Sequence, residues 1–168
     1  MINYTVTQLA EIKKCMDPII GPEYFLTNYF SVNRASGPSK FIMHDYCKNY
    51  LANIHSNKQS INLLSRQLGK TTLTAGYALW AALFVSYSSI MIMSPTLYMS
   101  KNIMQIIRFG YNNLPDFLKV DLVRNQVALL EFVNDSEIVI SSITESACRG
   151  RTLSLLLIDD LAHANTNE

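Results

Sequence analysis

The residue types best suited to chemistry in this chain lie together in its middle. They read Ser65, Arg66, Gln67, Leu68, Gly69, Lys70, Thr71 and Thr72. An apolar run, Ile61–Leu64, comes just before them, and a helix-forming stretch, Leu73–Phe84, comes just after. A strand, a tight loop with Gly-Lys-Thr and then a helix is the layout of a phosphate-binding P-loop. The alternative is a chance Gly-Lys-Thr at a helix start, because Leu64 stands where the usual pattern has its first glycine.

This layout suits an anion for a direct physical reason. Successive backbone N–H groups in the loop and at the helix start converge on one anionic site. Lys70 would add a positive charge against the β- and γ-phosphates, and Thr71 would offer its hydroxyl to Mg²⁺. We therefore expect Ser65–Thr72 to bind ATP together with Mg²⁺.

A pair of carboxylates follows the most apolar run of the chain. Leu153–Ile158 reads as a buried strand and is followed directly by Asp159 and Asp160. Because parallel strands bring their carboxyl ends to the same edge of a sheet, we expect Asp159 beside the Mg²⁺ and Asp160 near the attacking water. Alternatively, the two residues cap a turn.

Two arginines are further candidates. Arg66 lies inside the loop, where its guanidinium could stabilise charge on the γ-phosphate; an ion pair with a nearby acid is equally consistent. Arg149, followed by Gly150, could face nucleotide or DNA from a short helical turn, or lie on a solvated turn. Tyr46 and Cys47 precede the loop at a distance that could line an adenine pocket, although a core role fits Tyr46 as well.

Composition limits the class of protein. The chain has 168 residues, enough for about one domain, with 49% hydrophobic and 16% charged residues, which predicts a folded chain. The net charge of +1 provides no strongly basic stripe for nucleic acid. Cys15, Cys47 and Cys148 lack metal-ligand spacing and are expected to be free thiols. We expect no signal peptide and no membrane segment, because the longest apolar run, Ala78–Val85, is too short to span a bilayer.

Hydrophobic periodicity predicts alternating helices and strands. Helices are expected over 7–16 with Thr7 as its N-cap, and over 23–30, 44–54, 73–84 and 97–113. Strands are expected over 60–64, 89–93 and 153–158, with a hairpin formed by 127–132 and 138–143 and a loop over 36–39.

This order predicts an α/β P-loop NTPase of the RecA-like type, a three-layer sandwich with a mostly parallel sheet that ends after the acidic strand. Residues 1–58 would form a helical lead-in that includes the adenine-side segment, and residues 59–168 the ATPase core.

The motifs together resemble the ATPase domain of the large terminase subunit of tailed phages, and the loop sequence is close to that of the T-even type, which also carries the arginine and lacks the first glycine. The resemblance covers nearly the whole chain. The further matching segments, in order, are Asp17-Pro18, Glu23-Tyr24-Phe25, Asp45-Tyr46, Leu114-Pro115-Asp116-Phe117-Leu118, Arg149-Gly150 and Ile158-Asp159-Asp160.

The resemblance implies a role for each matching position. Lys70 and Thr71 would hold phosphate and Mg²⁺, Arg66 would act in cis on the γ-phosphate, Asp159 would be the metal-side acid, and Asp160 would hold the catalytic carboxylate position. The family has Glu at that position, and the shorter aspartate is expected to slow hydrolysis. The family's adenine-reading Gln aligns with Cys47, which cannot present both a donor and an acceptor to the base.

The resemblance also implies binding partners and a cellular location. The ATPase would drive double-stranded DNA into the prohead, with the portal protein and the small terminase subunit as partners, in the host cytoplasm and transiently at the prohead portal. Family members continue with a coupling motif and a nuclease domain, whereas this sequence ends at Glu168. We therefore expect residues 1–168 alone to be marginally stable and slow in hydrolysis, and a separate chain could supply the missing strands. The alternatives are a helicase-like ATPase fragment and a non-catalytic nucleotide-binding module.

Overall fold

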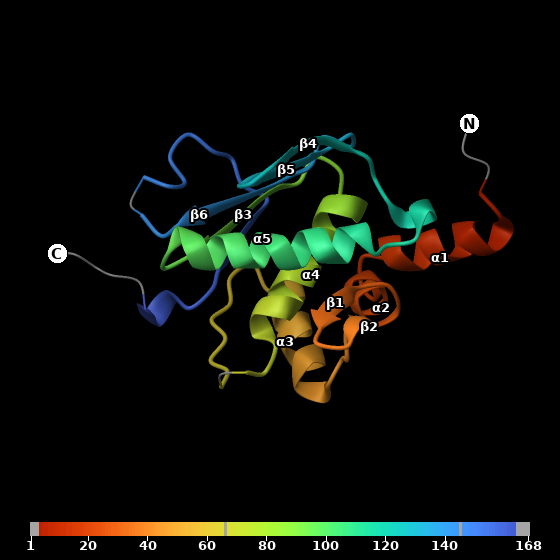
Figure 1. Ribbon diagram of the computed structural model, residues 1–168, viewed down its shortest axis with the longest axis horizontal. Coiled ribbons are helices and arrows are strands. Elements are labelled where there is room, and N and C mark those ends of the chain that lie inside the picture. The colour runs from red at the N-terminus through yellow and green to blue at the C-terminus, as the bar shows by residue number, and fades with distance from the viewer. Residues whose placement is uncertain (1–3, 66, 145, 164–168) are drawn as a thin grey trace.

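A five-stranded sheet organises the fold of this protein in the computed structural model (Figure 1), which describes residues 4–65, 67–144 and 146–163. The strand order is β4-β5-β6-β3-β7. The strands are β3 (Ser89–Ser94), β4 (Leu122–Gln126), β5 (Leu129–Phe132), β6 (Glu137–Ser142) and β7 (Leu155–Ile158).

The sheet is mixed, which corrects the expectation of a mostly parallel sheet. Strand β3 runs parallel to both β6 and β7. Strands β4, β5 and β6 are antiparallel neighbours, because short turns connect them in sequence and a short turn can join only antiparallel strands. The predicted hairpin is therefore present as β5 and β6, whereas β4 was not expected from the sequence.

Two helices cover one face of this sheet. Helix α4 (Lys70–Phe84) and helix α5 (Leu97–Asn112) pack against each other and against β3 and β6. Ile90 and Ile92 of β3 enter the core on this face. In the described residues the helices that contact the sheet do so from this side, so the structure has two layers here in place of the expected three. The predicted helices 73–84 and 97–113 lie within or close to α4 and α5.

The N-terminal elements pack on the two sheet-covering helices. They are α1 (Val6–Met16), α2 (Gly21–Asn28), the antiparallel hairpin of β1 (Ser31–Arg34) and β2 (Gly37–Lys40), and α3 (Asp45–Ser56). Helices α2 and α3 contact α4, β1 contacts α5, and α1 lies against α2. Phe30, which follows α2, is fully buried in the core shared with α4 and α5. Trp80 of α4 donates a hydrogen bond of 2.8 Å to the carbonyl of Cys15 and so ties α1 to the core.

Two local expectations in this region were wrong. Thr5, not Thr7, is the N-cap of α1, because its hydroxyl accepts from the backbone N–H of Gln8 while the Gln8 side chain accepts from the backbone of Thr5. The expected loop at 36–39 is largely strand β2, since a tight turn with Gly37 at φ 99° lets the chain fold back on β1.

The expected strand at 60–64 is absent, and this is the largest departure from the prediction. These residues are extended but unpaired, with Ile61 90% and Leu63 94% exposed. Strand β7 lies at the sheet edge, and its Leu156 and Ile158 are 42% and 43% exposed, so it is also less buried than expected. An apolar run becomes a strand only when a neighbouring strand satisfies its backbone groups, and in the described residues no strand pairs with 60–64.

None of the described helices has the length and apolar character needed to cross a lipid bilayer.

Candidate functional site

Residues 67–69 lead into α4 and shape one side of the candidate site. Gly69 is the N-cap of α4 and has φ 74°, a left-handed conformation that glycine adopts without strain. Gln67 also has a positive φ, of 65°. Lys70 and Thr71 are then the first residues of the helix, where backbone N–H groups have no partner within the helix and point toward an incoming anion.

The parallel pairing of β7 with β3 brings the acidic pair to the same place. Strand β7 is in register with β3 up to the pair Met93 and Ile158, and the backbone N–H of Asp159 donates to the Met93 carbonyl at 2.9 Å. The ladder therefore fixes the backbone at Asp159. Asp160 follows with φ 54°, which turns the chain away from the strand direction.

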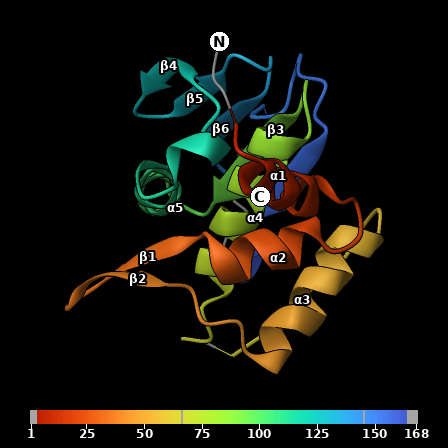
Figure 2. The ribbon, with the colours of Figure 1, turned by 90° about the vertical axis from the view of Figure 1, so that its right-hand side faces the viewer.

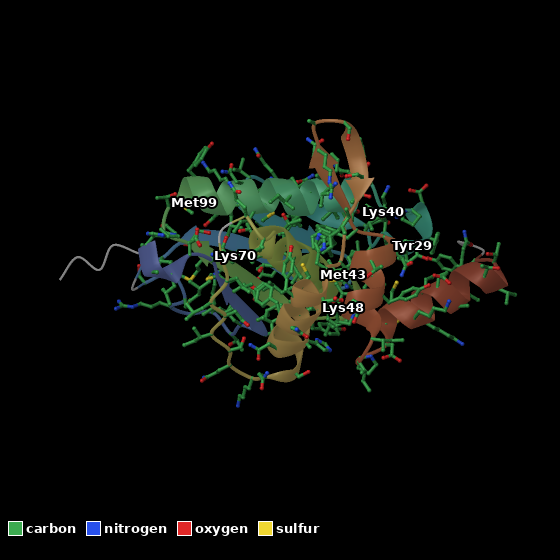
Figure 3. The ribbon with its side chains drawn as sticks, turned by 90° about the horizontal axis from the view of Figure 1, so that it is seen from below. Tyr29, Lys40, Met43, Lys48, Lys70 and Met99 are labelled. Carbon is green, nitrogen blue, oxygen red and sulfur yellow. The ribbon has the colours of Figure 1, made fainter. Side chains whose placement is uncertain are left out.

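Four predicted site residues meet at this junction. The hydroxyl of Thr71 donates to Asp159 Oδ2 at 2.7 Å. Lys70 Nζ lies 3.9 Å from Asp159 Oδ1 and makes a close hydrogen bond to Asp160 Oδ1. Figure 3 shows Lys70 in the middle of the face seen from below. The hydrogen bond to Asp160 raises the pKa of the Lys70 ammonium, and both carboxylates favour its charged form.

In this arrangement one ammonium faces two carboxylates, so a net negative charge remains among these three groups. The Asp159 side chain is only 10% exposed. Partly buried charges of this kind persist when they are paired and hydrogen-bonded. A phosphate entering at the helix start would take Lys70 away from the acids, which would then be available to a cation.

Tyr50, which was not selected as a site residue, lies next to this site. Its hydroxyl is 2.9 Å from Thr74 Oγ1 on α4. Burial raises the pKa of the Tyr50 phenol, and the negative charge of Asp159 raises it further. Tyr50 therefore anchors α3 against the first turns of α4. Its helical spacing from Tyr46 was visible in the sequence, but the contact with Thr74 was not.

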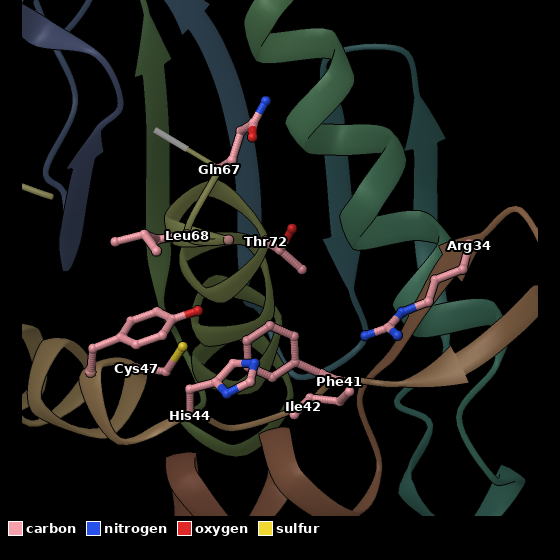
Figure 4. A pocket seen from close by; sticks show the side chains of 10 residues that line it. Arg34, Phe41, Ile42, His44, Cys47, Gln67, Leu68 and Thr72 are labelled. Atoms are coloured by element: carbon pink, nitrogen blue, oxygen red, sulfur yellow. The ribbon is translucent and has the colours of Figure 1, made fainter. Parts of the chain in front are cut away.

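A hollow of about 230 Å³ lies beside the loop. It brings together six residues that the sequence had assigned to nucleotide binding: Tyr46, Cys47, Gln67, Leu68, Gly69 and Thr72. Figure 4 shows the side chains of Cys47, Gln67, Leu68 and Thr72 around a common space. Tyr46 is 36% exposed and stacks on His44 with the ring centroids 5.3 Å apart, so it lines the hollow and does not fill the core. The hollow also contains four residues that the sequence analysis had not selected for it: Arg34, Phe41, Ile42 and His44.

The two candidate arginines are Arg66 and Arg149. Arg66 lies outside the described residues, so its proposed contact with the γ-phosphate stays a prediction. Arg149 lies in a turn, not a helix, and its backbone N–H donates to the carbonyl of Ser146 at 3.0 Å. Its side chain is exposed, as expected for a solvated turn. Ser65 is also exposed and precedes the loop without regular secondary structure.

The geometry is that of an α/β domain in which a glycine–lysine–threonine helix start faces an acidic strand end. The family model described as "Terminase large subunit, T4likevirus-type, N-terminal" matches residues 61–168, which is more than half of the chain and includes both parts of the site. The chain therefore belongs to the T4-type terminase large subunit family and corresponds to the N-terminal portion of such a subunit.

Proposed function

We propose that this chain is the ATP-binding and ATP-hydrolysing part of a phage terminase large subunit, with a P-loop of the RecA-like class, and that it powers DNA packaging. The observation that carries the proposal is the meeting of Lys70 and Thr71 with Asp159 and Asp160. Two motifs about ninety positions apart would have no local reason to meet, but a P-loop and its acidic partner strand must meet to act on one triphosphate.

In this proposal the loop binds the phosphates. Backbone N–H groups of residues 65–72 surround the β-phosphate, and Lys70 exchanges its bond to Asp160 for the β- and γ-phosphate oxygens. Thr72, which lines the hollow, approaches the α-phosphate, and the nucleoside extends toward Tyr46 and Cys47. The site thus has a phosphate end and a base end on either side of Thr72.

Thr71 and Asp159 are suited to hold Mg²⁺. Their side-chain oxygens are 2.7 Å apart, close to the separation of about 2.9 Å between adjacent oxygens of an octahedral Mg²⁺ with bonds of 2.0–2.1 Å. Both are oxygen donors, which this cation prefers. When bound, Mg²⁺ would neutralise charge on the β- and γ-phosphates.

The remaining residues would act on the γ-phosphate. Asp160, once released by Lys70, would orient the attacking water and accept its proton, and Arg66 would stabilise the charge that develops on the phosphate. The aspartate side chain is one methylene shorter than glutamate. A misplacement of about 1 Å can lower a rate on the order of 10²-fold, so we expect slow turnover.

Membership of the terminase family favours a packaging role over that of a helicase-like ATPase. We propose double-stranded DNA, the portal protein and the small terminase subunit as partners. The place of action would be the host cytoplasm, transiently at the prohead portal.

Titration calorimetry with ATP and Mg²⁺ tests the proposal. The intact chain should bind ATP, and Lys70→Ala should lose at least tenfold in affinity while keeping its fold. Lys101→Ala, which removes an exposed lysine from α5, is the matched control and should bind as the parent does. Unchanged ATP binding in Lys70→Ala would refute the phosphate-loop assignment.

A further inference from the structure

The β1–β2 hairpin holds an arginine at a defined position near its tip. Arg34 is the last residue of β1 and pairs with Gly37 across the turn. The base of the hairpin is tied to the core, because the N–H of Phe41 donates to the Phe30 carbonyl at 3.0 Å and Phe30 is fully buried. Figure 2 shows the hairpin projecting from the body of the molecule. Its anchored base and short turn restrict where Arg34 can lie.

Arg34 reaches the hollow from the side opposite the loop. Figure 4 shows its guanidinium directed toward Phe41 and Ile42, while Gln67 and Thr72 form the other wall. Among the described residues that line the hollow, none carries a carboxylate. Among the described residues Arg34 takes part in none of the ion pairs, unlike Arg124, which is paired with Glu131 at 3.1 Å.

The surroundings of Arg34 suit a flat ring better than a phosphate. On its side of the hollow lie Phe41, Ile42 and the imidazole of His44, which stacks on Tyr46. Lys70, the expected partner of the terminal phosphates, does not line this hollow. A guanidinium is planar and weakly hydrated, and it stacks on aromatic faces as well as attracting them electrostatically.

We propose that Arg34 is a base-binding residue that closes the base end of the nucleotide site by stacking its guanidinium on the purine. This inference rests on the proposed function. It assigns a nucleotide contact to the hairpin, which precedes residues 61–168 of the family match. It also supplies base recognition in a site where Cys47 cannot act as an amide reader.

Paired titrations with ATP and with inorganic tripolyphosphate test this assignment, because tripolyphosphate lacks the base. Arg34→Ala should weaken ATP binding on the order of tenfold and leave tripolyphosphate binding unchanged. Arg34→Lys should stay weakened, since an ammonium has no planar face to stack. Arg124→Ala, an exposed arginine on strand β4, is the control for loss of one positive charge.

The outcomes separate the two proposals. Equal loss of ATP and tripolyphosphate in Arg34→Ala, restored by Arg34→Lys, would overturn base stacking in favour of a phosphate contact. Unchanged ATP binding in Arg34→Ala, together with loss in Lys70→Ala, would overturn only the role of Arg34. Retention of both ligands by Lys70→Ala would remove the proposed function and the inference with it. A melting temperature of Arg34→Ala equal to that of the parent chain shows that the substitution has left the fold intact.

Discussion

Thr71 at the start of α4 and Asp159 at the end of β7 share a hydrogen bond of 2.7 Å although 88 positions separate them in the chain. The bond joins the helix that begins at the loop to the edge strand of the sheet. Because each residue is held by its own element, the helix start in one case and the β-ladder in the other, the two oxygens are positioned before any ligand arrives. Such preorganisation reduces what ligand binding must order.

The first prediction concerns this pair. Asp159→Asn should weaken ATP binding strongly in the presence of Mg²⁺, because an amide is a poorer ligand for a hard cation than a carboxylate. Binding measured with EDTA should change little by comparison. Calorimetry with and without Mg²⁺ gives both values. Equal losses under the two conditions would show that Asp159 does not act through the metal.

The second prediction concerns the length of the acidic side chain at residue 160. Asp160→Glu should raise the rate of ATP hydrolysis, by as much as the order of 10²-fold if the aspartate misplaces the water by about 1 Å. ATP affinity should change much less. Phosphate release under saturating ATP measures the effect, and Asp160→Asn, which lacks a base, is the control. A Glu variant no faster than the Asn variant would contradict a role for residue 160 in activating water.

The third prediction concerns pH. Hydrogen bonds from Lys14, Tyr24 and Tyr29 lower the pKa of Glu11 from 4.5 to about 2. Because the folded-state pKa is depressed, the stabilisation is fully present above pH 4.5 and is lost as the pH falls toward 2. The melting temperature should therefore fall through this window, and Glu11→Gln should show a smaller fall over the same range.

Thr5→Ala removes the N-cap of the same helix without touching Glu11, and so serves as the control. It should lower the melting temperature by a similar amount at every pH in the window. If Glu11→Gln and the parent show the same pH dependence, the Glu11 network does not contribute as described.

The fourth prediction concerns the packing of Phe30 between two helices. A Cβ added at Gly110 of α5 would lie 2.3 Å from Cε2 of Phe30, and one added at Gly76 of α4 would lie 2.9 Å from Cε1 of the same ring. The ring therefore cannot move away from one helix without meeting the other. Gly110→Ala should destabilise the protein by about 1–3 kcal/mol, despite the better helix propensity of alanine.

Urea denaturation measures this change, and a double variant tests its cause. Phe30→Leu in the Gly110→Ala background should recover part of the loss, because the smaller side chain leaves room for the new methyl group. Strictly additive effects of the two substitutions would argue against a clash at this contact.

Several elements could be predicted from the sequence because their signals are local. Apolar spacing predicted α5 and the β5–β6 hairpin closely, and the helix expected over 73–84 is present as α4, which begins earlier, at Lys70. Whether residues 60–64 form a strand could not be predicted from the local sequence alone. The apolar residues of this segment fit a strand, but a strand also needs a neighbour, and in the described residues β7 leaves that edge unpaired.

For the candidate site, too, some features could be predicted from the sequence and others could not. The sequence by itself determined which side chains could do chemistry, namely the lysine and threonine after Gly69 and the two aspartates after an apolar run. Only the tertiary structure decided that Asp160 holds Lys70 and that Arg34 of the hairpin shares a hollow with the loop. Residue type and spacing express local physics, whereas the parallel register of β7 on β3 and the docking of the hairpin depend on contacts between distant segments.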